Sequence, residues 1–332
     1  MAGREPSSLK RVRFAPSPTG TLHIGNALSA VANRRLGDWM LLRIDDTDPA
    51  RNVPGGEEAI VADLEWLGVG WEERVRQSKR GDRYARAVAD LGTTRFDGVT
   101  LLREDGSATY HLASVVDDID FGITHVVRGN DHRPNEALHR RLHEALGTTA
   151  PEYVHHGLIL GPDGKKLSKR AEGATVGSLR EAGIPAEAVR AYLEELGIPR
   201  HDVHLDLARV RRLAVEAIQA LSDEELAARV GADVRYVPVM RGARDLNEAR
   251  RFVDELLAPP AVNVADAETL DRFRELIELP PRELLRELKA AGGDLRALRL
   301  ALTGQERGPE LAAVLAALPR EEALRRVEAA LG

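Results

Sequence analysis

The residues with the clearest chemistry in this chain are His23 and Gly25, which stand where a short extended run and a sharp turn lead into a helix. Residues 12–15 suit a strand, two prolines end it, and the alanine-rich residues 26–35 favour a helix. The first turn of a helix has unpaired backbone N–H groups, and its positive dipole end favours anions. The segment therefore predicts a seat for phosphate, and the plainer alternative is a turn that carries a solvated histidine.

Two charged segments further along the chain could serve the same ligand. Residues 39–49 form an apolar run that ends in an acidic cluster, and open α/β sheets bind ligands at the carboxyl ends of their strands. About 140 residues after His23, the segment 161–170 makes a turn and then concentrates positive charge. Alone it would be a solvated basic turn, but together with a phosphate seat it predicts cations that reach the phosphates.

The elements that must position these residues alternate between strand and helix over the first half of the chain. We predict strands at 12–15, within 39–49, at 124–128 and at 153–160, helices at 26–35, 52–67, 76–90 and 134–146, and a short β pair formed by 99–103 and 109–112. This order predicts an α/β fold with a Rossmann-type parallel sheet, to which the later strands return. Helical patterns broken by Gly and Pro after residue 172 predict a mainly α-helical C-terminal region.

The composition is that of an ordinary globular protein with room for two domains, since 43% of the 332 residues are hydrophobic and 30% are charged. The chain has no cysteine, which excludes disulfides and cysteine-ligated metals, and we expect no zinc. Its apolar runs are shorter than the ~18 residues that a membrane span needs, and its first residues lack the apolar core of a signal peptide. We therefore expect a cytoplasmic monomer without a membrane partner.

Two signatures stand together in this chain, at residues 23–26 and 166–170. They resemble the motifs usually written HIGH and KMSKS, which mark the class I aminoacyl-tRNA synthetases. The finer resemblance is to glutamyl-tRNA synthetases, through segments at Arg13–Gly20, Leu42–Asp48, Tyr110–Asp118 and Gly122–Gly129, and through Leu298–Gly304 and Gly308–Leu311, which are similar to the end of that family's anticodon-binding region. The resemblance covers nearly the whole chain.

The resemblance implies an ATP-dependent ligase that activates glutamate to glutamyl-adenylate and passes it to an acceptor. Mg²⁺ would accompany the ATP phosphates. Charge builds on the phosphates during the attack, so fixed positive groups are the main catalytic device. By the family pattern the catalytic residues are His23, Lys166 and Lys169, and the other ATP-binding residues are Gly25, Asn26, Ser168 and Arg170.

The amino acid carries two carboxylates and one ammonium group, which require bidentate cations and a buried acid. The resemblance assigns the carboxylates to Arg13 and Arg128, the ammonium group to Asp45, the substrate side chain to Tyr110, and the lining of the pocket to Ala15, Ser17 and Ser114. A structural ion pair is the alternative for each arginine.

Three positions depart from the family pattern. Asn26 ends the first signature, where the motif that gives it its name has His. Asp45 stands where bacterial glutamate enzymes usually carry Glu, so the acid is one methylene shorter. Asn130 stands where an acidic residue is common, which weakens any role carried over to residues 130–132.

The largest departure is one of length. The family normally inserts a small domain that holds the acceptor end of tRNA, and only about 18 residues, 92–109, are available here, too few to fold alone. We predict a catalytic domain at 1–172 with this shortened insertion, a helical stem-contact-like region at 173–240, and a reduced anticodon-binding-like domain at 241–332. The net charge of −6 gives a polyanion little general attraction, so we expect tRNA binding to be weakened.

Four functions are compatible with these patterns. The leading one is a glutamyl-tRNA synthetase-like ligase, and the second is a tRNA-independent ligase that passes the activated amino acid to a small molecule or a carrier protein. A catalytically idle binding protein would not need the intact His23, Lys166, Lys169 and Arg128. Nucleotidylyl transfer to an alcohol phosphate would leave the aspartate-rich strand end and the C-terminal match unexplained.

Overall fold

The computed structural model describes residues 9–165, 167–168, 171–258, 260 and 262–332. The chain divides into two compact units, Met1–Glu181 with Val189–Leu207, and Ala182–Ala188 with Ala208–Gly332. The first unit is built on parallel strands and the second is helical, so the predicted fold class is confirmed. Within the described residues, no helix is long and apolar enough to cross a membrane.

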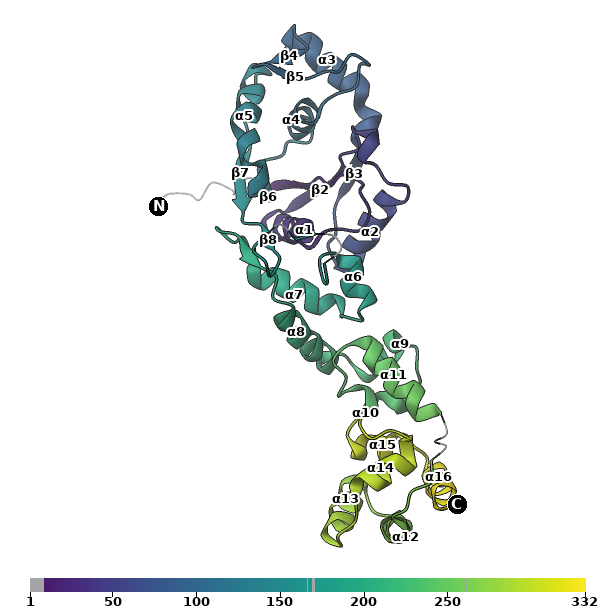
Figure 1. Cartoon of the computed structure of the whole chain (residues 1–332). Helices are drawn as coiled ribbons and strands as arrows, with labels where there is room; N and C mark the ends of the chain where they lie inside the picture. Colours follow the sequence, from purple (N-terminus) through teal and green to yellow (C-terminus); the bar gives the residue numbers. More distant parts are fainter. Residues whose placement is uncertain (1–8, 166, 169–170, 259, 261) are drawn as a thin grey trace. The chain divides into compact units, whose positions relative to one another are not determined.

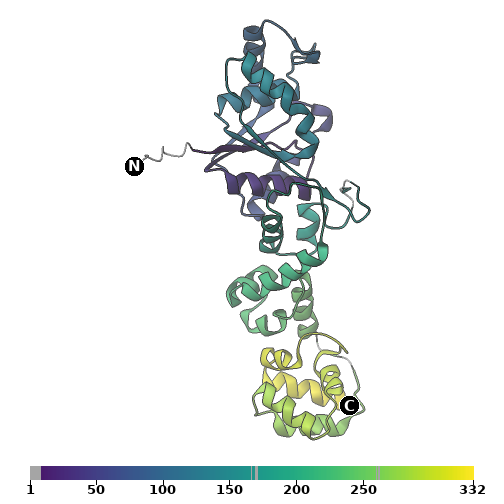
Figure 2. The same cartoon turned by 90° about the vertical axis from the view of Figure 1, so that its left-hand side faces the viewer.

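The strands of the first unit pair in parallel, with helices as crossovers. One sheet has the order β1 (Arg11–Phe14), β2 (Trp39–Ile44), β3 (Glu73–Arg76), and α1 (Ile24–Leu36) and α2 (Gly56–Trp66) connect its strands. Two further parallel pairs are β6 (His125–Gly129) with β7 (Glu152–His156), and β8 (Ile159–Leu160) with β9 (Val203–His204). In Figure 2, α1 (purple) lies on one side of the strands and the blue-teal helices of residues 110–145 lie on the other.

We expected the later strands to join the first strands in one continuous sheet. The hydrogen bonds between the strands instead form separate sheets. β6 lies beside β1 but belongs to a separate sheet. Only the start of this boundary is bonded, where the Thr124 N–H donates to the Arg11 carbonyl at 2.8 Å and the Arg11 N–H donates to the Thr124 hydroxyl at 2.9 Å. Further along, the Val127 carbonyl accepts from the Asn33 side chain of α1, so a side chain satisfies a group that a neighbouring strand could have bonded.

The predicted β pair at 99–103 and 109–112 is wrong. The chain makes a smaller hairpin, β4 (Arg95–Phe96) with β5 (Val99–Thr100), and α4 then covers Tyr110–Asp120. Asp97 and Gly98 both have positive φ, +50° and +78°, the form of a two-residue hairpin turn. The buried side chains after it follow a helical spacing of three and four, at Leu112, Val115, Val116 and the partly buried Ile119, which a short apolar run conceals.

Several predicted helices begin later than expected, and a short 3-10 segment precedes each of them. These segments are η1 (Pro49–Arg51), η2 (Gln77–Arg80) and η3 (Asn130–Asn135), and the helices after them are α2, α3 (Gly81–Leu91) and α5 (Glu136–Ala145). Strand β3 was not predicted, since three of its four residues are exposed and charged.

The chain beyond residue 172 is mainly helical, as predicted (Figure 1). Its helices are α6 (Val176–Glu181), α7 (Ala186–Leu196), α8 (Leu207–Ala220), α9 (Asp223–Val230), α10 (Val237–Met240), α11 (Leu246–Leu257), α12 (Ala267–Leu276), α13 (Pro281–Ala290), α14 (Leu295–Thr303), α15 (Leu311–Ala317) and α16 (Arg320–Leu331), with the 3-10 segment η4 (Val234–Tyr236) before α10. In the second unit, Arg326 of α16 donates to the Leu256 and Leu302 carbonyls, at 2.8 and 2.7 Å. One buried cation thus satisfies carbonyls in the last turns of α11 and α14.

Gly157, between β7 and β8, offers a test of the packing in the first unit. A Cβ there would lie 1.9 Å from the His201 carbonyl oxygen, a backbone atom that cannot turn away. Gly157→Ala should therefore lower the free energy of unfolding by about 1–3 kcal/mol, measured by urea denaturation. Gly70→Ala is the control, because a Cβ at Gly70 meets nothing within 4 Å. Equal stability of the two variants would contradict this close approach of Gly157 to the His201 carbonyl.

Candidate active site

A fully buried arginine organises the carboxyl end of β2. Arg43 is 0% exposed and donates to both carboxylate oxygens of Asp45, at 2.7 and 3.1 Å. It also donates to Asp118 at 3.2 Å, and to the carbonyl and hydroxyl of Ser114 at 3.3 and 3.2 Å. Burial lowers the pKa of Arg43, but the neighbouring carboxylates outweigh it and hold the pKa well above its ordinary value. Asp45 is therefore fixed in orientation at the strand end.

The carboxylates of α4 continue this network. Asp118 also accepts from Arg13 of β1 at 3.2 Å, so one carboxylate joins two buried arginines. Asp117 is fully buried and accepts from Gln77, Arg80 and Tyr84 at 2.8–3.1 Å. Sequence reasoning gave no role to Arg43, Asp117 or Asp118, although the quoted Asp-Asp pair and the Arg-x-Asp spacing of β2 were visible.

Arg128, at the end of β6, differs from the other buried arginines of the first unit. It is 5% exposed, and its Nε donates to His155 Nε2 at 3.2 Å, while its Nη1 donates to the Tyr110 hydroxyl at 3.4 Å. Its Nη2 is buried without a hydrogen-bond partner, and no carboxylate of the described residues forms an ion pair with it. Burial lowers its pKa, and the nearby charge of Arg13 adds to this. The site thus holds a buried guanidinium with a free donor and without an ion-pair partner, which suits an anion.

The start of α1 is shaped by His23. His23 is the N-cap residue, and its Nδ1 accepts from the Gly25 N–H at 3.1 Å, so the proton of a neutral ring lies on Nε2. That Nε2 lies 3.0 Å from the Leu167 carbonyl of the lysine-rich segment. The turn before it is fixed by Asp63, which accepts from the Thr21 hydroxyl and the Leu22 N–H at 2.6 and 2.7 Å. Two segments about 140 residues apart therefore meet at this helix start.

The remaining residues singled out from the sequence are placed as follows. Ala15 and Ser17 are half-buried after β1, Asn26 is exposed in the first turn of α1, and Ser168 is exposed. Ser114 is fully buried against Arg43. Lys166, Lys169 and Arg170 lie outside the described residues. No group of three or more His, Asp or Glu that could hold a metal ion occurs in the described part of the chain.

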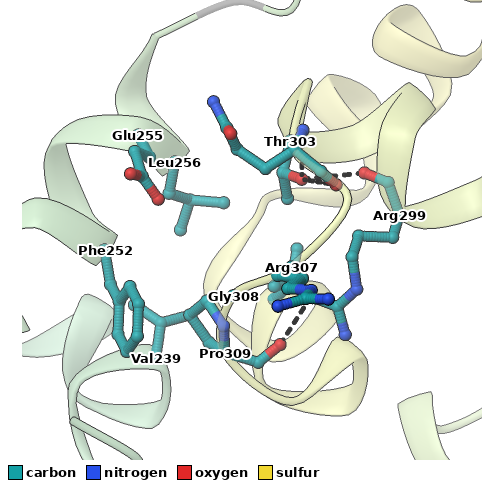
Figure 3. Close-up of a pocket in the computed structure, with 11 residues that line it drawn as sticks. Val239, Phe252, Glu255, Leu256, Arg299, Thr303, Arg307, Gly308 and Pro309 are labelled. Atoms are coloured by element: carbon teal, nitrogen blue, oxygen red, sulfur yellow. Dashed lines mark hydrogen bonds between the residues drawn. The ribbon is translucent and has the colours of Figure 1, made fainter. Parts of the chain in front are cut away.

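A concave feature lies in the second unit, between α10–α11 and the loop after α14 (Figure 3). Phe252, Val239 and Leu256 line one side, and Arg299 and Arg307 lie on the loop side. Arg299 donates to the Pro309 carbonyl at 2.6 Å, and burial lowers its pKa. The feature combines an apolar wall with two guanidinium groups, and it is remote in sequence from the strand-end residues.

Comparison with known proteins gives the family. The catalytic-domain model of the class I tRNA synthetases (E and Q) matches residues 10–94 and 91–223, well over half of the chain. The chain belongs to this family. An anticodon-binding-domain model matches residues 282–331. The resemblance drawn from the two signatures is thereby confirmed.

Curated relatives and solved structures agree with the family. The chain is 34% identical to glutamate–tRNA ligase 1 of Rubrobacter xylanophilus, over 96% of this chain and 97% of the relative, and 33% identical to a glutamate–tRNA ligase of Akkermansia muciniphila, over 96% and 98%. A glutamate tRNA ligase structure from Elizabethkingia meningosepticum covers 98% of this chain and 99% of its own, with a TM-score of 0.77. At 23% identity, that likeness shows the fold alone.

The same comparisons bear on the length of this chain relative to its relatives. The alignment to the Rubrobacter protein runs over 419 positions although this chain has 332 residues, so the relative carries stretches with no counterpart here. The two segments that match the catalytic-domain model meet at residues 91–94. This is the end of α3, immediately before the β4–β5 hairpin.

Buried neutral histidines make stability depend on pH. Burial lowers the pKa of His139 to about 2 and that of His155 to about 4, whereas an unfolded histidine titrates near 6.5. Below pH 6.5 the unfolded chain takes up protons that the folded chain does not, so the free energy of unfolding should fall as pH falls from 6.5 towards 4. His139 alone should contribute a loss of about 2 kcal/mol at pH 5.

His139→Leu should flatten this pH dependence in denaturant unfolding at pH 5 and 7. His204→Leu, at an exposed position, is the control and should keep the wild-type slope. Equal slopes in all three proteins would show that His139 is already protonated in the folded state.

Proposed function

We propose that this protein activates glutamate with ATP and transfers the glutamyl group to tRNA. The observation that carries the proposal is the buried guanidinium of Arg128, whose Nη2 has no hydrogen-bond partner and which forms no ion pair with a carboxylate of the described residues. A buried unpaired cation is costly unless a ligand supplies the anion. The side-chain carboxylate of glutamate would supply it, and glutamine would not. Membership of the (E and Q) family limits the choice to these two amino acids.

In the first step, an α-carboxylate oxygen of glutamate attacks the α-phosphorus of ATP. The bond from that phosphorus to the bridging oxygen breaks, and pyrophosphate leaves with the electron pair. We assign the developing phosphate charge to the α1 start with His23, Gly25 and Asn26, and to Lys166, Lys169, Ser168 and Arg170 of the second signature. The contact between His23 and the Leu167 carbonyl brings the two signatures together, and His23 would have to exchange this carbonyl for a phosphate oxygen when ATP binds.

We assign the substrate ammonium group to Asp45 and the second carboxylate to Arg13, with Tyr110, Ala15 and Ser17 around the amino acid. The two oxygens of Asp45 each accept one bond from Arg43, which leaves lone pairs for an ammonium group. Ser114 would act through Arg43, since its hydroxyl accepts from that residue. Arg13 already pairs with Asp118, so its role in binding is secondary to that of Arg128.

Mg²⁺ would enter with ATP rather than occupy a dedicated protein site, because a divalent ion bound to nucleotide takes phosphate oxygens as its main ligands. In the part of the chain that the structure describes, no cluster of three acids or histidines is arranged for it. We propose a cytoplasmic location, where ATP, glutamate and tRNA are found together.

In the second step, a terminal ribose hydroxyl of tRNA attacks the acyl carbon, and AMP leaves. The anticodon-domain match at residues 282–331, and the apolar wall with Arg299 and Arg307 in the same unit, support tRNA as the acceptor. The domain roles proposed are catalysis at 1–172, stem contact at 173–240 and anticodon contact at 241–332. The hairpin that follows α3 replaces the acceptor-holding insertion, so we propose that tRNA is held weakly.

The pocket assignment is tested by ATP–pyrophosphate exchange. The wild type should prefer glutamate to glutamine, and Arg128→Ala should lower kcat/KM for glutamate by roughly 10²- to 10³-fold and erase the preference, because the substrate carboxylate loses its charged partner. Arg141→Ala is the matched control, an exposed arginine of α5 that pairs with Asp97. A wild type that activates glutamine as well as glutamate would contradict the assignment.

The acceptor is tested by acylation of total and purified tRNA at increasing salt. Exchange should proceed without tRNA, and charging should be much slower than exchange and weaken with salt, because few phosphate contacts remain. A parallel search for glutamylated small molecules and carrier proteins covers the alternative acceptors. Charging as fast as exchange would refute weakened tRNA binding, and glutamate found only on another acceptor would refute tRNA as the acceptor.

A further inference from the structure

Arg128 is oriented by a neutral partner instead of a carboxylate. Its Nε–H donates to His155 Nε2 at 3.2 Å, and its guanidinium lies over the Tyr153 ring, 4.8 Å from the centroid. The other buried arginines of the first unit are oriented by anions, Arg13 by Asp118 and Arg43 by Asp45 and Asp118. The guanidinium of Arg128 is thus held in place without a carboxylate of the described residues paired to it.

The bond from Arg128 decides where the proton of His155 lies. An arginine Nε can only donate, so His155 Nε2 must be the acceptor and the ring proton must lie on Nδ1. That Nδ1 lies 3.5 Å from the Glu136 carboxylate, in the first turn of α5. The other oxygen of Glu136 is engaged by Arg140, at 2.8 and 2.7 Å, so the carboxylate is already paired. Glu136 can select the tautomer of His155 without neutralising Arg128.

The groups that face His155 come from four elements. They are Arg128 on β6, His132 and Arg133 in η3, Glu136 on α5 and Tyr153, which stacks on the His155 ring from β7. The side chain of His155 is 2% exposed. Burial and the neighbouring Arg128 both lower its pKa, to about 4, so the ring stays neutral over the range in which a cytoplasmic enzyme works.

We propose that His155 is a positioning residue that determines specificity. Glu136 orients the His155 ring, and His155, a neutral hydrogen-bond acceptor, holds the guanidinium of Arg128 in place. The positive charge of Arg128 is thereby left for the side-chain carboxylate of glutamate. This deepens the proposed function and rests on it. An anionic residue at position 155 would hold Arg128 equally well but would compete with the substrate carboxylate. The proposal therefore separates two properties of position 155, its ability to accept a hydrogen bond and its lack of charge.

The test compares His155→Gln with His155→Glu, two side chains of the same shape that differ in charge. Pyrophosphate exchange gives KM for glutamate, glutamine and ATP. The Gln variant should stay within a few-fold of the wild type, because its amide oxygen can accept from Arg128. The Glu variant should raise KM for glutamate roughly 10- to 100-fold, the scale of a charge-assisted hydrogen bond, and reduce the preference over glutamine by the same factor. KM for ATP should not change in either variant.

Equal KM values for glutamate in the two variants would overturn the charge argument. A loss shared by glutamate, glutamine and ATP, with a lowered melting temperature, would make His155 a structural residue and overturn the proposal. Calorimetric titration of glutamate into the wild type and both variants repeats the comparison without catalysis. Wild-type glutamate binding without exchange would count against the proposed function alone, whereas no wild-type binding would overturn both.

Discussion

The stability of the first unit depends on how the free-energy cost of its buried charges is offset. Arg43 is fully buried, and such a cation is tolerated only because Asp45, Asp117 and Asp118 surround it. Loss of a partner from a buried network of this kind typically costs 3–5 kcal/mol, since the charge left behind cannot reach water. The network joins β2 to α4, and through Asp118 and Arg13 it reaches β1. The residues that we propose contact the substrate are therefore positioned by other side chains, which do not contact it themselves.

The two buried arginines Arg43 and Arg128 differ in how their side chains are paired. Around Arg43 every donor has a partner, which gives a rigid base at the strand ends. Around Arg128 the Nη2 group is left without a hydrogen-bond partner, and no carboxylate among the described residues forms an ion pair with it. A protein that only needed stability would pair or replace such a group, so the free donor of Arg128 supports the proposed ligand site.

The β4–β5 hairpin lies where we propose that the acceptor-holding insertion is shortened, and it leaves this network intact. The β4–β5 hairpin turns at Asp97–Gly98, and its tip is tied to α5 by the ion pair between Asp97 and Arg141. The chain then enters α4, which carries Tyr110 and the buried aspartates. The buried aspartates of α4 are bonded to β1, β2 and α3, so the network does not depend on the hairpin.

The sequence alone determined the helix start at His23, the acidic end of β2 and the arginine at the end of β6, because each depends on local order along the chain. It also determined the family, since its signatures are contiguous. Only the tertiary structure decided that Tyr110 lies on a helix, because a short apolar run fits a strand or a helix until its buried face is known. The partners of Arg43 and Arg128 were likewise decided by folding: Asp118 and His155 lie 75 and 27 residues away, and no spacing rule reaches that far.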